Sequence, residues 1–148
     1  MMIERVGLND LEQLIKIEKK VFREDAFSRE TIKKLILQNT LFLKIEDDNL
    51  SNKIIGFVIA IKDDEDRVNI INFVIQKKFQ KQGYGSLLLK KALERINRIK
   101  GVKRIILNVK TSNVSAIDLY KKFNFRIVGK IEQYYRQKES AYLMELKI

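Results

Sequence analysis

Residues 72–85 read Asn72-Phe-Val-Ile-Gln-Lys-Lys-Phe-Gln-Lys-Gln-Gly-Tyr-Gly85 and form the most informative stretch of the chain. A short apolar run leads into a loop with two glycines, and an amphipathic pattern begins directly after Gly85. Apolar residues then recur at helical spacing between lysines and arginines, at positions 88, 89, 92, 93, 96 and 99. We expect a strand, a glycine turn and a helix here, with Gly101 as the cap that ends the helix.

The junction between this strand and this helix is suited to binding an anion. The first N–H groups of a helix have no partner within it, and the helix dipole favours negative charge at that end. Glycines at 83 and 85 have no Cβ, so a ligand can approach the backbone closely. The stretch does not fit a Walker loop, and it lacks the third glycine of a dinucleotide loop because position 88 is Leu. It predicts a pyrophosphate site of another type.

The pattern Gln80-x-x-Gly83-x-Gly85 resembles the Q/R-x-x-G-x-G/A loop of the GNAT superfamily of N-acetyltransferases. A second block resembles the S-N-x-x-A-x-x-L-Y segment after the fifth strand of that superfamily; its matching residues are Ser112, Asn113, Ala116, Leu119 and Tyr120. The doubled tyrosine at 134 and 135 narrows the resemblance to RimI-type ribosomal-protein alanine acetyltransferases and the catalytic subunits of protein N-terminal acetyltransferases. The resemblance covers nearly the whole chain.

The resemblance implies a mixed α/β fold in a single domain over residues 1–148. It implies a largely antiparallel sheet of six to seven strands, splayed between strands 4 and 5 and flanked by about four helices. The hydrophobic pattern agrees: it predicts strands near 2–6, 41–46, 53–62, 67–75, 104–110, 126–133 and 140–146, and helices at 10–22, after 28, after 85 and at 113–123. A chain of 148 residues that is 45% hydrophobic has room for one core.

Composition excludes several classes of chemistry. The chain has no cysteine and no histidine, which excludes disulfides, a cysteine nucleophile, a Ser–His–Asp triad and an imidazole base. A metal would have to rest on carboxylates alone, and the acidic clusters at 46–48 and 63–66 are typical of solvated turns, so no metal is expected. No apolar run approaches the roughly 18 residues of a membrane helix and no signal peptide opens the chain, so we expect a cytoplasmic protein without a membrane partner.

The positive charge is concentrated in one segment. Residues 76–122 hold 13 Lys or Arg against only Glu94 and Asp118, while the other positions hold 17 basic and 17 acidic side chains. A positive field there would speed the encounter with the phosphates of coenzyme A, although a lysine-rich face that promotes solubility gives the same pattern. Aromatic residues are not interleaved with the basic ones, so direct sequence-specific nucleic-acid binding is not expected. An enzyme that works beside the ribosome could use the same field near RNA.

The resemblance assigns acetyl-CoA as co-substrate. It implies that backbone groups of Phe73, Val74 and Ile75 hold the pantetheine arm and thioester. The loop that would hold the pyrophosphate comprises Gln80, Lys81, Gln82, Gly83, Tyr84, Gly85 and Ser86. Asn113 is suited to capping the next helix, and its family counterpart also contacts the donor. Tyr120 matches the family's general acid, since a phenol with a pKa near 10 stays protonated at neutral pH; the alternative is an ordinary core tyrosine.

Asn108 occupies the position where RimI-type enzymes carry a Glu and many eukaryotic relatives carry a His as general base. A carboxamide cannot take a proton, so either Glu24, Tyr134 or Tyr135 acts instead, or no base is needed. Tyr134 and Tyr135 match residues that line the acceptor groove of relatives, the alternative being a surface aromatic pair. The expected acceptor is the α-amine of a protein or peptide N-terminus. Alternatives are a small-molecule amine, such as a polyamine or antibiotic, and a non-catalytic acetyl-CoA-binding module.

Overall fold

The computed structural model describes residues 2–38, 41–49, 52–136 and 138–148. Within these ranges seven strands form one sheet in the order β1-β2-β3-β4-β5-β7-β6. The strands are β1 (Met2–Arg5), β2 (Leu41–Asp47), β3 (Lys53–Asp64), β4 (Arg67–Ile75), β5 (Arg104–Lys110), β6 (Arg126–Ile131) and β7 (Ala141–Lys147). The helices are α1 (Leu11–Phe22), α2 (Arg29–Leu37), α3 (Tyr84–Asn97) and α4 (Val114–Lys122). The expected mixed α/β fold is confirmed; the single domain over 1–148 includes positions outside the described ranges and stays a prediction.

The sheet opens between β4 and β5, as expected. All neighbouring strands are antiparallel except this pair, which runs parallel and pairs only from Arg67 to Ile70 with Arg104 to Leu107. On its other side β4 stays paired with β3, but Ile59 faces Asn72 while Ala60 faces Ile70, so Ile71 is an extra, bulged residue. Such a bulge bends and twists a strand locally. It lies where β4 turns away from β5.

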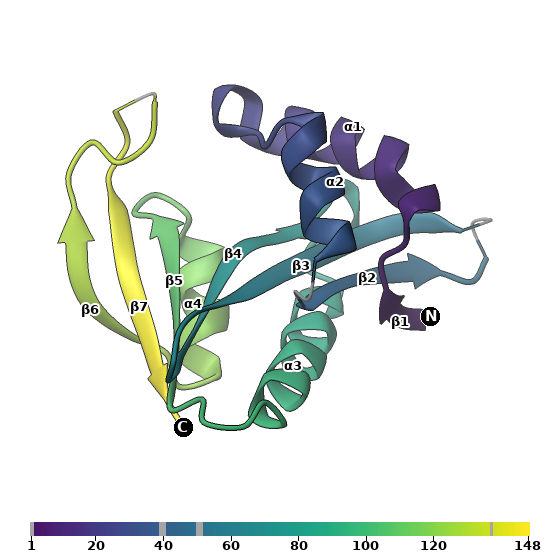
Figure 1. The fold of residues 1–148 in the computed structure, drawn as a ribbon. Coiled ribbons are helices and arrows are strands. Elements are labelled where there is room, and N and C mark those ends of the chain that lie inside the picture. Colours follow the sequence, from purple (N-terminus) through teal and green to yellow (C-terminus); the bar gives the residue numbers. More distant parts are fainter. Residues whose placement is uncertain (1, 39–40, 50–51, 137) are drawn as a thin grey trace.

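Helices cover both faces of the sheet (Figure 1). Helices α1 and α2 pack on one face over a core that includes Leu14, Phe57 and Val74, and α3 and α4 pack on the other over Leu88, Leu107 and Phe125. Each helix is amphipathic and buries its apolar stripe, which is the expected source of its stability. The gap between β4 and β5 therefore runs from the α1–α2 face to the α3–α4 face.

Most boundaries agree with the predicted ones to within one or two residues. The predicted start of α2 is confirmed, since the Ser28 hydroxyl accepts the Thr31 N–H at 3.2 Å as an N-cap. The prediction that Gly101 ends α3 is wrong: α3 ends at Asn97, where N–H groups of Arg98 and Ile99 bond three residues back and tighten the last turn. Strand β6 stops at Ile131, ahead of the predicted position 133, because Gln133 adopts a positive φ of 50°.

Among the described residues, no helix has both the length and the apolar character that crossing a membrane requires.

Candidate active site

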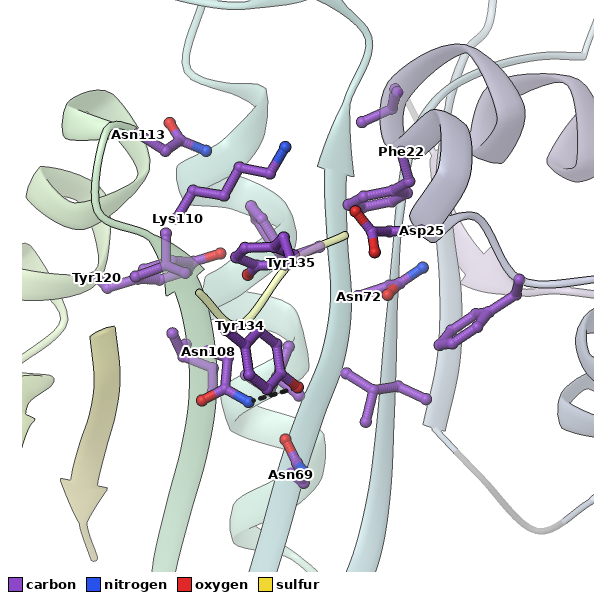
Figure 2. Close-up of a pocket in the computed structure, with 17 residues that line it drawn as sticks. Phe22, Asp25, Asn69, Asn72, Asn108, Lys110, Asn113, Tyr120, Tyr134 and Tyr135 are labelled. Atoms are coloured by element: carbon purple, nitrogen blue, oxygen red, sulfur yellow. Dashed lines mark hydrogen bonds between the residues drawn. The ribbon is translucent and has the colours of Figure 1, made fainter. Parts of the chain in front are cut away.

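A pocket of about 720 Å³ lies where β4 and β5 part. It is lined by β4 residues 69–73, β5 residues 107–110, the end of α1 with the turn that follows, the loop between β6 and β7, and Tyr120 of α4. Figure 2 shows these side chains converging from both faces of the sheet. Because the lining comes from both faces, one ligand can reach the pocket from the α3–α4 side while another enters from the α1–α2 side.

The glycine loop lies at the N-terminus of α3. Gly83 is the residue before the helix and has φ +89°, a conformation that other L-residues rarely adopt. A Cβ built on Gly83 would have no neighbour within 4 Å, so the space beside its backbone is open. Gly85 is different, because a Cβ there would lie 3.3 Å from Leu119 of α4. The expected close approach of a ligand therefore fits Gly83, whereas Gly85 allows α3 and α4 to pack closely.

Other residues of the predicted loop shape its backbone. The Gln80 side chain donates to the Ile75 carbonyl at 2.9 Å and closes the loop onto the end of β4, and the Gln82 side chain donates to the Lys78 carbonyl at 3.3 Å. Lys81 adopts a positive φ of 62°. The nearby Lys53 ammonium lowers the pKa of Lys78, which shows that positive charge is crowded beside the loop. Tyr84 and Ser86 lie in the first turn of α3, whose N–H groups are free to meet an anion.

The predicted β4 residues lie along the open edge of that strand. Beyond Ile70, β4 has no pairing with β5, so the backbone groups of Phe73, Val74 and Ile75 on that side are available to an extended ligand. The side chain of Phe73 lines the pocket and that of Val74 is buried under α1 and α2. This arrangement fits the pantetheine arm of a coenzyme A, which carries amides that need hydrogen-bond partners.

Tyr120 and Asn113 come from α4 and the turn before it. Tyr120 is 5% exposed, and its ring lies 5.9 Å from the rings of both Phe73 and Phe125. Its hydroxyl points into the pocket toward Tyr135 (Figure 2). Burial, with a smaller contribution from Tyr135, raises the pKa of Tyr120 above its usual value, so the phenol is protonated at neutral pH. The Asn113 side chain accepts the Ala116 N–H at 3.3 Å as the cap of α4, and it also lines the pocket.

Tyr134 and Tyr135 form one wall of the pocket. Their rings lie 4.9 Å apart at 89°, and the Asn108 side-chain N–H₂ donates to the Tyr134 hydroxyl at 3.1 Å (Figure 2). Burial raises the pKa of Tyr135 to about 12, with smaller contributions from Tyr134 and Asp25. Tyr135 is therefore protonated at neutral pH and is a poor candidate for the general base. The Asp25 carboxylate accepts the Arg136 N–H at 3.3 Å and joins the α1–α2 connection to the β6–β7 loop over the pocket.

The third candidate base lies elsewhere. Glu24 is in the short turn η2 (Arg23–Asp25) and is exposed outside the pocket lining, whereas its neighbour Asp25 faces the pocket. The sequence patterns also gave no role to Asn72, which lines the pocket, or to Glu18, which is buried behind it. Two features of the sequence could have pointed to these residues. Asn72 is a polar residue within the largely apolar strand 68–75, and Glu18 is an acidic residue on the apolar face of α1.

Glu18 is 1% exposed and binds two donors, the Phe27 N–H at 2.9 Å and the side-chain N–H₂ of Asn72. Burial raises the pKa of Glu18 to about 7, although both hydrogen bonds act in the opposite direction. The carboxyl group thus joins α1, the segment before α2 and β4 directly beneath the pocket.

Comparison with known proteins identifies the same architecture. Residues 8–125 match the acetyltransferase (GNAT) family. The chain is 38% identical over 76 residues to an N-alpha-acetyltransferase of Sulfolobus acidocaldarius, a match that spans 51% of the chain and 45% of that protein. It is 27% identical to an N-alpha-acetyltransferase of Saccharolobus solfataricus, over 96% of the chain and 90% of that protein. The ribosomal-protein-S18-alanine N-acetyltransferase structure from Escherichia coli superposes with a TM-score of 0.84 and 25% identity, covering 99% and 93% of the two chains.

Proposed function

The chain belongs to the acetyltransferase (GNAT) family, whose members transfer an acetyl group from acetyl-CoA, and from that premise we propose that it acetylates the α-amine of a protein or peptide N-terminus. The observation that carries the proposal is the pocket between β4 and β5, which continues from the open β4 edge to the wall formed by Tyr134 and Tyr135. One side of it fits an extended thioester, and the other is open to an amine.

The donor side would hold acetyl-CoA chiefly through backbone groups. The N–H groups at the start of α3, beside the open space at Gly83, suit the pyrophosphate. The free edge of β4 at 73–75 suits the pantetheine amides, and a backbone N–H of the same strand would stabilise the charge that develops on the acetyl oxygen. Bound acetyl-CoA supplies an acetyl group activated as a thioester.

The residues of the pocket support direct transfer. The neutral acceptor amine attacks, a bond forms between its nitrogen and the acetyl carbon, and the bond between that carbon and sulfur breaks. Tyr120 gives its hydroxyl proton to the departing sulfur and regains a proton from solvent, while the proton lost by the amine passes to water. No covalent enzyme intermediate is needed, and the chain has no cysteine to form one.

The lack of a base at position 108, where Asn stands, favours an N-terminal amine over a lysine side chain. An α-amine with a pKa of about 8 is roughly a tenth neutral at pH 7, whereas a lysine with a pKa of about 10.4 is less than a thousandth neutral. Asn108 cannot accept a proton, and Tyr135 is held protonated by its raised pKa. An acceptor that supplies its own neutral fraction removes the need for a strong base.

A peptide array incubated with labelled acetyl-CoA tests the proposal. We expect label on peptides with a free N-terminus and none on the same peptides when the N-terminus is blocked and a lysine is present. Turnover of spermidine or of an aminoglycoside, without peptide turnover, would replace the peptide acceptor by a small amine. Acetyl-CoA binding without turnover of any amine would identify a binding module instead.

A further inference from the structure

The buried carboxyl group of Glu18 has no part in the transfer just described, although it lies directly behind the pocket wall. It is 1% exposed and pairs with Asn72 and with the Phe27 N–H, and no salt bridge to a described residue balances its charge. A buried carboxyl without a cation costs free energy. An apolar residue would pack there at lower cost, so the position of this group calls for a functional explanation.

The donor and acceptor pattern around Glu18 fixes the orientation of the Asn72 amide. The Asn72 side-chain N–H₂ donates to Glu18, as an ionised carboxylate, which can only accept hydrogen bonds, requires. The amide oxygen of Asn72 is thereby turned the other way. Figure 2 shows this oxygen on the side of Tyr134 and Tyr135, with the nitrogen on the opposite side. Asn72 lines the pocket next to the bulged Ile71, where β4 leaves β5.

We propose that Glu18 is a positioning residue that directs the amide oxygen of Asn72 into the pocket, where this oxygen accepts a hydrogen bond from the N–H of the attacking amine. The inference rests on the proposed function, because it requires an amine acceptor. A carbonyl oxygen binds an amine N–H without removing a proton, so the nitrogen keeps its lone pair for attack. The same carboxyl group also accepts the Phe27 N–H. Glu18 therefore fixes both the segment before α2 and the amide oxygen that would bind the amine.

Glu18→Gln tests the orientation with almost no change of shape. The new glutamine side chain has one accepting oxygen, which the Phe27 N–H occupies, and its own N–H₂ then faces Asn72. The Asn72 amide turns over to present its oxygen to that N–H₂, and its own N–H₂ faces the pocket. We expect the acceptor KM to rise about tenfold, the effect of losing one hydrogen bond, with the KM for acetyl-CoA unchanged. Glu12→Gln, the same substitution on the exposed side of α1, is the matched control and should leave both KM values unchanged.

A donor–acceptor swap provides the rescue. In the double variant Glu18→Gln/Asn72→Asp, the new glutamine accepts from the Phe27 N–H and donates to one oxygen of the new aspartate, whose other oxygen faces the pocket again. The acceptor KM should return to within about threefold of the wild-type value, because the two changes act on one shared pair. If Glu18→Gln does not fold, Asn72→Leu offers a second route: it removes the oxygen, leaves Glu18 paired with Phe27, and should raise the acceptor KM about tenfold.

The outcomes separate this inference from the proposed function. A raised acceptor KM that the double variant restores, with melting temperatures near wild type, supports the inference. An unchanged acceptor KM in Glu18→Gln, or a rise that the double variant fails to reverse, overturns it while the wild-type enzyme still acetylates peptides. A fall in melting temperature without a change in KM would show that Glu18 is only structural. A wild-type protein that acetylates no amine refutes the proposed function and the amine-binding role of Asn72 together.

Discussion

The donor side of the pocket is built largely from main-chain groups, whereas the acceptor side is built from side chains. On the donor side the open β4 edge and the N–H groups at the start of α3 would do the binding under the proposed function, and Gly83 keeps the space beside them open. On the acceptor side Asn72, Asn108, Tyr134 and Asp25 project from four separate parts of the chain. A site made of main-chain groups suits one fixed ligand. A site made of side chains can change by substitution to accept different acceptors, and such substitutions leave the main-chain site intact. Substitutions can test this division in order of expected effect.

Tyr120→Phe should have the largest effect on rate. Loss of the hydroxyl removes the proton donor, and turnover should fall by about 10²–10⁴-fold, with acetyl-CoA affinity nearly unchanged. The ring and its contacts with Phe73 and Phe125 remain, so the melting temperature should change little. Steady-state kinetics and thermal unfolding of the same preparation provide both measurements. A stability loss of about 0.5–1.5 kcal/mol with the rate preserved would instead identify a core tyrosine with a paired hydroxyl.

Gly83→Val should abolish acetyl-CoA binding and leave the acceptor side and the fold intact. Valine resists the positive φ of +89° at this position, and its branched side chain enters the open space beside the loop. Titration calorimetry should show loss of acetyl-CoA binding in a protein that still unfolds cooperatively. Near-normal affinity would contradict the assignment of this loop to the pyrophosphate.

Asn108→Glu should act on the acceptor side with a smaller effect. The wild-type rate should rise with pH toward the pKa of the acceptor amine, because only the neutral amine reacts. A carboxylate at 108 would remove the proton at lower pH and raise the rate at pH 6.5–7 by several-fold, less than the 10²–10⁴-fold effect of a fully positioned base. The comparison of pH–rate profiles is the measurement. A wild-type profile that breaks near pH 6 would reveal a protein base other than the residues named above.

The pH dependence of stability should report on Glu18, on the acceptor side, without any substrate present. The pKa of Glu18 is about 7 in the folded protein and 4.5 without the fold, so the folded state binds more protons between these values. The contribution of Glu18 to stability therefore falls as pH rises from about 4.5 to about 7, by about 1.4 kcal/mol per unit of separation, and is constant above that window. Urea unfolding at pH 5 and pH 8 should show a larger decrease for wild type than for Glu18→Gln. An equal decrease in both proteins would mean that Glu18 is already ionised at pH 5.

The two sides of the pocket also differ in how far sequence could predict them. The strand, glycine turn and helix that form the donor side were predictable because Gln80, Gly83 and Gly85 are close in sequence and each residue type has a physical reason. Gly85 differs from the prediction, because it allows α3 and α4 to pack closely. Asn72 and Glu18 are 54 residues apart and meet only once α1 covers the sheet. No local pattern predicts such a pair. The prediction that Gly101 ends α3 was wrong because a glycine in the sequence does not show where the hydrogen bonds of the helix change. The helix ends at Asn97, where the last hydrogen bonds span three residues instead of four.

The contact between Asp25 and Arg136 has a practical consequence for protein engineering. Its donor is the main-chain N–H of residue 136, so the bridge over the pocket does not depend on the Arg136 side chain, which is exposed. Position 136 can therefore carry a cysteine for a fluorophore or cross-linker, placed beside the pocket entrance, while the two loops stay joined. Since the chain has no native cysteine, such a label would attach at this position alone. Proline is the substitution to avoid, because it has no N–H to donate.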